Sequence, residues 1–189
     1  GLGDVYKRQG ILIALIVLYL LSPALNDLKN RVRSIVQVPH AVANIRHAQV
    51  SLAEFLLTLP EDLEVAVNDI GVVSYLTGRV PFDFLGLGRI EVGKKMLAAE
   101  YTPATRQRLA AEAGIELACL HPAYFEPFGG LPDSWLKIAS WRIPHPVNCA
   151  EELSFFLLNE MKHDEVVALL QEFEPDLPEG VRCTYYSAP

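Results

Sequence analysis

Two short acidic motifs carry the residues best suited to chemistry. Asn68 and Asp69 follow the strand-like run 63–67 and precede an apolar, helix-like run that begins at Ile70. In an open α/β sheet, ligands bind beyond the carboxyl ends of the strands. At that place Asp69 can coordinate a metal, act as a base or hold a sugar hydroxyl. It can also cap the helix that follows, as Asp does well, and capping is the role we expect.

The second motif centres on Asp83, which interrupts the apolar run 80–85. A buried carboxylate without a partner is unfavourable, so Asp83 is expected to be paired. Arg79 is the nearest candidate, and a structural ion pair is favoured over catalysis.

Other catalytic patterns are weak or absent from the sequence. Gly86-Leu87-Gly88 lacks the rest of a dinucleotide-binding fingerprint, and no Walker A, Gly-x-Ser-x-Gly or His-Glu-x-x-His motif occurs. Five histidines are scattered without ligand spacing, so no metal and no cofactor is expected. Ser74, His121 and Asp83 can be drawn together as a hydrolase triad, but no nucleophile elbow supports that alternative.

The remaining reactive or aromatic residues have ordinary explanations. Cys119 is expected to be a buried strand residue, and Cys149 and Cys183 can pair only in an oxidising compartment. A group of aromatic side chains is expected to pack in the core, with a sugar-stacking or membrane-interface surface as the alternative. That group comprises Tyr124, Phe125, Phe128, Trp135 and Trp141.

The elements that position these residues alternate between strand and helix. Strand-like runs are expected at 63–67, 80–85, 115–120, 136–143, 153–158 and 181–186, and helices at 41–59, 70–76, 91–100, 103–113 and 163–173. This alternation predicts an α/β fold with a mixed, mostly parallel sheet and flanking helices. No helix separates 136–143 from 153–158, so that pair is expected to be antiparallel.

Composition divides the 189 residues into two parts. The first 50 residues hold six Lys/Arg and two Asp/Glu, and the rest hold ten and twenty-one. An overall charge of −7 argues against nucleic-acid binding, which needs a basic face. The apolar excess is concentrated in residues 11–21, eleven apolar residues in a row.

The N-terminal segment has several readings. Residues 4–9 resemble a translated sequencing adaptor, so residues 1–9 are set apart as an artefact. The uncharged stretch 10–26 is then the end of a transmembrane helix that began upstream, with a signal peptide or a buried core helix as alternatives. Residues 27–40 are expected to be a linker and 41–189 the soluble domain. The basic residues Lys29, Arg31 and Arg33 weakly favour a cytoplasmic flank.

Residues 65–76, VAVNDIGVVSYL, and 82–87, FDFLGL, carry a resemblance to a known family. They resemble the C-terminal soluble domain of bacterial multi-spanning glycosyltransferases of the GT-C type. These are similar to dolichyl-phosphate-mannose mannosyltransferases and aminoarabinose transferases. The shared features are an Asn-Ile pair (44–45), Asn-Asp-x-Gly (68–71), a Tyr (75), Asp-x-x-Gly-Leu (83–87) and an aromatic stretch that ends at Trp135.

The resemblance implies a domain on the outer side of the bacterial inner membrane. The full-length enzyme would take a sugar from a polyprenyl-phosphate donor and pass it to a glycan or lipid acceptor. The catalytic acid would lie in an early loop upstream, so the resemblance assigns no catalytic residue here. It makes Asn68, Asp69, Tyr75 and Asp83 the candidate ligand-binding residues. Membrane lipid is the expected partner of the anchor. The alternative is a membrane-anchored α/β binding or interaction module without catalysis.

Overall fold

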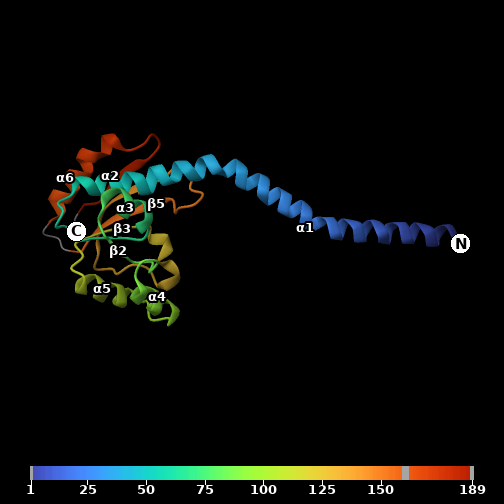
Figure 1. Ribbon diagram of the computed structural model, residues 1–189, viewed down its shortest axis with the longest axis horizontal. Coiled ribbons are helices and arrows are strands. Elements are labelled where there is room, and N and C mark those ends of the chain that lie inside the picture. The colour runs from blue at the N-terminus through green and yellow to red at the C-terminus, as the bar shows by residue number, and fades with distance from the viewer. Residues whose placement is uncertain (1, 159–161, 188–189) are drawn as a thin grey trace. The chain divides into compact units, whose positions relative to one another are not determined.

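The computed structural model describes residues 2–158 and 162–187. The chain divides into two units, residues 1–39 and 40–189, and each is described by itself. Figure 1 colours the chain from its N-terminus to its C-terminus and labels the elements.

Helix α1 (Leu2–Asn44) makes up the described part of the first unit, continues for five residues into the second and includes both Pro23 and Pro39. In the described part of the chain, one helical stretch, Gln9–Thr58, is long and apolar enough to cross a membrane. Its large apolar side chains are exposed, with Leu18 at 70% and Ile35 at 71%. Residues 27–40, expected as a linker, are helical throughout.

The second unit is an α/β fold. After the end of α1, a stretch of π-helix, η1 (Ile45–Val50), continues into helix α2 (Ser51–Thr58). Further along the chain lie β1 (Val65–Val67), α3 (Ile70–Thr77), β2 (Phe82–Asp83), α4 (Ile90–Leu97), α5 (Pro103–Glu112) and β3 (Leu117–Leu120). The later elements are η2 (Pro122–Tyr124), η3 (Glu126–Phe128), β4 (Leu136–Arg142), β5 (Glu152–Leu157), α6 (His163–Phe173), η5 (Glu174–Asp176) and β6 (Arg182–Tyr185).

The sheet is mixed, with strand order β2-β1-β3-β5-β4-β6. Strand β1 pairs in parallel with β2 and with β3. The pairings β3–β5, β4–β5 and β4–β6 are antiparallel, so parallel pairing is confined to one half of the sheet. The predicted α/β class with a mixed sheet and flanking helices is confirmed, and so is the antiparallel pair β4–β5.

Two apolar cores cover the two faces of the sheet. One packs the face of Val67, Cys119 and Phe155 against helices α2, α3 and α6. The other packs the face of Ala66 and Ala118 against α4, α5 and the loop after β3. Figure 1 shows α2 and α6 on one side of the sheet and α4 and α5 on the other.

The predicted core aromatic residues are confirmed where the burial is complete. Phe125 and Trp141 are fully buried and Trp135 is 5% exposed. The alternative, a sugar-stacking or membrane-interface surface, is therefore wrong for these three. Cys119 is buried, and Cys149 and Cys183 are free thiols. Helix α5 begins after Thr102, whose hydroxyl accepts a hydrogen bond from the Thr105 backbone N–H, as a capping threonine should.

Candidate functional site

The candidate site lies where the parallel strands β1 and β3 end. Val67 is the register partner of Cys119, so the residues that follow, Asn68 and His121, emerge at the same edge of the sheet. Asn68 is 3% exposed, and its Oδ1 accepts the backbone N–H of His121 at 2.7 Å. This side chain therefore ties the two strand ends together and fixes the spacing of the residues beyond them.

Asp69 occupies the N-cap position of α3, but its side chain makes no capping hydrogen bond. The expectation that Asp69 caps the helix is therefore wrong. Its Oδ2 instead accepts a hydrogen bond from Nε2 of Gln49, which projects from the π-helical segment η1. A residue twenty positions away holds the carboxylate, and its second oxygen has no hydrogen bond among the described residues.

His121 is the buried titratable group of this edge, with 4% exposure. Its Nδ1 lies 2.6 Å from the backbone carbonyl oxygen of Glu152, so we assign the proton to Nδ1. Burial lowers the pKa of His121, and the Glu152 carbonyl and the Asp69 charge oppose that shift only in part. The imidazole is therefore neutral near pH 7, and its Nε2 is a hydrogen-bond acceptor.

Tyr124 and Cys149 belong to the same surroundings. The rings of His121 and Tyr124 have centroids 5.3 Å apart. Burial raises the pKa of Tyr124, and the charge of Asp69 adds to the effect although a hydrogen bond with the Ala150 backbone opposes it. Burial also raises the pKa of Cys149, with a further contribution from Asp69. Cys149 therefore stays a thiol and is unsuited to nucleophilic catalysis.

We call Asn68, Asp69, His121 and Tyr124 the carboxyl-edge cluster. It offers one carboxylate, one neutral imidazole, one phenol and one amide. Such a set of acceptors and neutral donors suits the hydroxyl groups of a polar ligand. Within the described residues, no group of three His, Cys, Asp or Glu side chains is arranged to hold a metal ion.

The structure does not bring Asp83 into the cluster as a free carboxylate. Asp83 is 2% exposed, and its own loop satisfies it through the backbone N–H groups of Leu85 at 2.8 Å, Gly86 at 3.1 Å and Gly88 at 2.6 Å. Arg79 donates instead to the carbonyls of Leu59 at 2.7 Å and Pro60 at 2.9 Å. The predicted Asp83–Arg79 pair is therefore wrong, because main-chain donors supply the compensation that an ion pair was expected to give.

The glycines of this loop are needed for its shape. Gly86 has a φ of +76°, and a Cβ on it would lie 2.6 Å from the backbone nitrogen of Gly93. The Asp-x-x-Gly-Leu motif at 83–87 therefore has a structural explanation.

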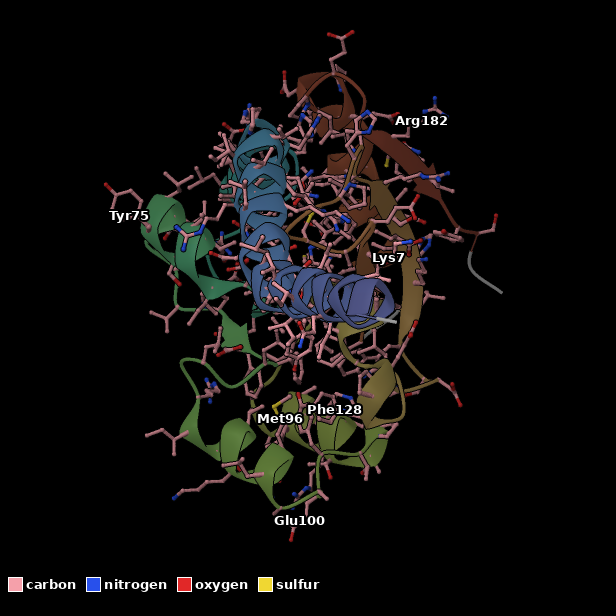
Figure 2. The ribbon with its side chains drawn as sticks, turned by 90° about the vertical axis from the view of Figure 1, so that its right-hand side faces the viewer. Lys7, Tyr75, Met96, Glu100, Phe128 and Arg182 are labelled. Carbon is pink, nitrogen blue, oxygen red and sulfur yellow. The ribbon has the colours of Figure 1, made fainter. Side chains whose placement is uncertain are left out.

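Tyr75 is a surface residue and makes no hydrogen bond to the cluster among the described residues. Its side chain is 87% exposed on α3, and Figure 2 shows it at the periphery of the folded unit. The hydrolase alternative also lacks its geometry. Asp83 is bonded to its own loop and His121 Nδ1 to the Glu152 carbonyl, and no hydrogen bond between Ser74, His121 and Asp83 is found in the described part of the chain.

Sequence reasoning missed Gln49, and it considered His121 only in the hydrolase alternative and Tyr124 only among the aromatic residues. His121 directly follows the predicted strand 115–120, so the rule that singled out Asn68 and Asp69 also applied to it. Gln49 gave no comparable signal, because its role depends on a tertiary contact from a helix.

Comparison with known proteins gives one result that covers most of the second unit. A family model described as a domain of unknown function, DUF8728, matches residues 43–168. No curated protein and no solved structure matches the chain.

Proposed function

The chain belongs to the DUF8728 family, and we propose that its folded unit is the C-terminal extracytoplasmic domain of a bacterial membrane glycosyltransferase. In this proposal the full-length enzyme resembles the dolichyl-phosphate-mannose mannosyltransferases and aminoarabinose transferases. It takes a sugar from a polyprenyl-phosphate donor and transfers it to a glycan or lipid acceptor. The 189-residue chain itself is non-catalytic, and its cluster helps to bind the acceptor.

The observation that carries this proposal is the state of Asp69. A carboxylate at the start of a helix ordinarily bonds to the first backbone N–H groups. Asp69 is held away from that role by Gln49, beside a neutral imidazole and beyond the ends of two parallel strands. A carboxylate and a neutral imidazole together accept and orient sugar hydroxyls without a metal ion.

The membrane part of the proposal rests on the helix that precedes the folded unit. Its length and apolar surface suit a lipid-facing span. We place it in the bacterial inner membrane, with the folded unit on the outer side. The basic residues Lys29, Arg31 and Arg33 favour the opposite orientation, but large domains translocate largely regardless of such flanks.

The complete reading frame tests the architecture. We expect several further hydrophobic spans upstream, with an acidic residue in the first external loop. A single span would contradict the proposal and would favour the alternative, a membrane-anchored binding or interaction module without catalysis.

A topology reporter tests the location separately. Alkaline phosphatase fused after Pro189 is expected to be active in a bacterial host, because that enzyme requires an oxidising compartment. Green fluorescent protein fused at the same position is the matched control and is expected to stay dark when exported unfolded. Strong fluorescence with an inactive phosphatase would put the domain in the cytoplasm and contradict the extracytoplasmic placement.

A further inference from the structure

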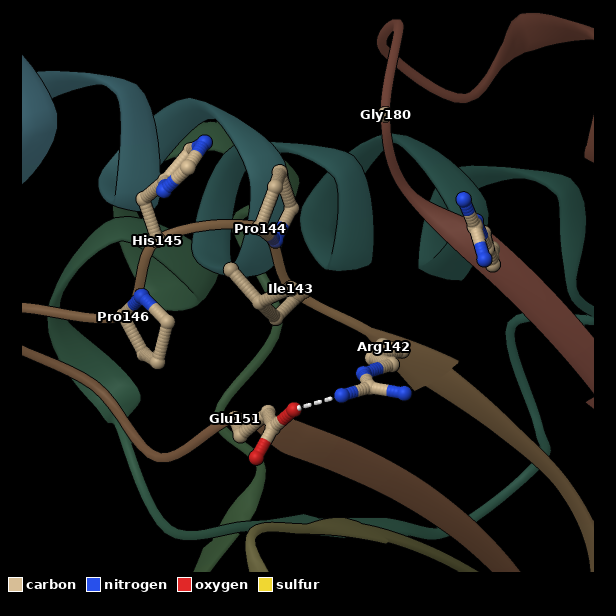
Figure 3. A pocket seen from close by; sticks show the side chains of 8 residues that line it. Arg142, Ile143, Pro144, His145, Pro146, Glu151 and Gly180 are labelled. Atoms are coloured by element: carbon tan, nitrogen blue, oxygen red, sulfur yellow. Dashed lines mark ion pairs between the residues drawn. The ribbon is translucent and has the colours of Figure 1, made fainter.

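A second polar site lies in the antiparallel half of the sheet, where β4 ends and β6 begins. A pocket of about 320 Å³ opens between the end of β4, the turn that follows it and the start of β6. Figure 3 shows the side chains that line it. The lining residues are Arg142, Ile143, Pro144, His145, Pro146, Glu151, Gly180 and Arg182, and none of them belongs to the carboxyl-edge cluster.

The pocket holds two arginines that face each other across neighbouring strands, an arrangement that does not favour folding. Arg142 and Arg182 are direct register partners on β4 and β6. Like charges directly opposite each other on neighbouring strands destabilise a sheet. Glu151 forms an ion pair with Arg142 at 2.5 Å, drawn as a dashed line in Figure 3. Among the residues that the structure describes, Arg182 has no ion pair, so the site keeps an uncompensated cation.

The wall of the pocket is rigid. His145 stands between two prolines and has a φ of +48°, which is uncommon for a residue with a side chain. Asn44, 1% exposed, fixes this turn by donating to the Pro144 carbonyl at 3.1 Å and accepting the Val147 N–H at 2.8 Å. A strained turn held by a buried amide is pre-organised, which is typical of binding sites.

From this arrangement we propose that the pocket binds a phosphate group. Arg182 supplies the free guanidinium, whose planar N–H groups match phosphate oxygens. Arg142 joins it by exchanging Glu151 for the ligand, a small loss because exposed ion pairs contribute little. His145 also lines the pocket, with its ring centroid 5.5 Å from that of His40. The phosphate belongs either to a lipid headgroup or to a soluble ion, and the inference holds whether or not the chain is part of a glycosyltransferase.

Titration of the full chain in dodecyl maltoside micelles tests the proposal. The probes are inorganic phosphate, short-chain phosphatidic acid and short-chain phosphatidylcholine, with affinity measured by calorimetry in phosphate-free buffer. We expect inorganic phosphate, phosphatidic acid or both to bind, and phosphatidylcholine to bind much more weakly. Binding of phosphatidic acid alone identifies the headgroup as the source, and equal binding of inorganic phosphate identifies a soluble ion.

Three variants make the test specific. Arg182→Gln is expected to weaken binding about tenfold, as the loss of a charge-assisted hydrogen bond should. Arg108→Gln is the matched control, because Arg108 is an exposed arginine with an acidic neighbour, Glu112, at 3.9 Å, and it should leave binding unchanged. Glu151→Gln should tighten binding, since it removes the carboxylate that competes for Arg142.

Two results would overturn the proposal. One is the absence of binding of either phosphate probe to the wild-type chain. The other is an equal loss of affinity in Arg182→Gln and Arg108→Gln, which would show attraction to overall charge and no site.

Discussion

The two halves of the sheet differ in what covers them. In the parallel half, β2-β1-β3, both faces are buried: Val67 lies in one apolar core and Ala66 in the other. In the antiparallel half, β5 is also buried on both faces, with Phe155 in one core and Phe156 in the other, and only the outer edge is open, where Arg142, Arg182 and Thr184 are exposed. A strand buried on both faces leaves polar side chains room only at its ends, whereas a half-covered strand also carries them along its open face.

This difference explains where the two candidate sites lie. The carboxyl-edge cluster lies at the ends of β1 and β3, beyond their buried residues. The arginine pocket uses the open face and the turn of the antiparallel half. The π-helical segment η1 contributes Gln49, which bonds to Asp69, and the last residue of α1, Asn44, bonds to the turn of the pocket. Single turns of π-helix occur frequently at functional sites.

The sharpest contrast is between the two faces of the antiparallel half. Trp141→Ala removes a fully buried ring that packs on Phe155 at 4.7 Å between centroids, and should lower the free energy of unfolding by about 3–5 kcal/mol. Thr184→Ala, on the open face of β6, should change it by less than about 0.5 kcal/mol. Urea denaturation measures both. Similar losses in the two variants would show that the open face is covered after all.

A second variant tests whether water is excluded from the core that covers one face of the parallel half. Arg106 is fully buried, and its guanidinium donates to the backbone carbonyls of Tyr101 at 2.9 Å and Phe128 at 2.9 Å and also to that of Gly130. Arg106→Met should lower the free energy of unfolding by about 2–3 kcal/mol, because buried carbonyls lose a charged donor. Arg108→Met, on the exposed side of the same helix, is the control. A loss below about 0.5 kcal/mol for Arg106→Met would mean that water reaches these carbonyls.

The pH dependence of stability tests the burial of His121. Burial lowers the pKa of His121 in the folded chain, so the unfolded chain binds more protons. Stability from this group is fully present above the unfolded pKa of about 6.5 and falls as the pH drops below that value. His121→Gln should lack this component. The measurement compares the free energies of unfolding of both proteins at about pH 7.5 and at about pH 5.5, on either side of that pKa. Parallel changes in the two proteins would contradict a buried neutral imidazole.

A small effect is expected near the start of β4. Lys137 pairs with Glu152 at 2.5 Å, and both side chains are partly exposed. Lys137→Met should change the free energy of unfolding by at most about 1 kcal/mol, as partly exposed ion pairs do. Lys94→Met on α4 removes an exposed lysine elsewhere and serves as the reference. A loss of more than about 3 kcal/mol would place Lys137 in a buried network.

Local sequence signals predicted most elements of the fold. The apolar spacing of 163–173 matches α6 residue for residue, and Thr102 with Pro103 marks the start of α5. The lack of a helix between β4 and β5 correctly predicted their antiparallel pairing. The order of the strands was not accessible, because it depends on contacts between distant segments and leaves no periodicity in one sequence.

The site was predicted only in part, for the same reason. Asn68 and Asp69 were found because they follow a strand, but the role of Asp69 depends on Gln49 from another helix. Asp83 was expected to need a cation, although a glycine-rich loop supplied three backbone donors instead. Both errors come from assuming the commonest partner for a carboxylate where tertiary structure supplies another.

The proposed role of Asp69 is tested most directly by sugar transfer from a radiolabelled polyprenyl-phosphate donor, using the protein of the complete reading frame in its membrane. The wild-type protein should transfer sugar and the 189-residue chain alone should not. Asp69→Asn should raise the KM for the acceptor about tenfold, the loss expected for one hydrogen bond to a charged group. Its free energy of unfolding should stay within about 1 kcal/mol of wild type, because the side chain caps no helix. Absence of transfer by the wild-type protein, or unchanged transfer with a destabilised Asp69→Asn variant, would contradict the account.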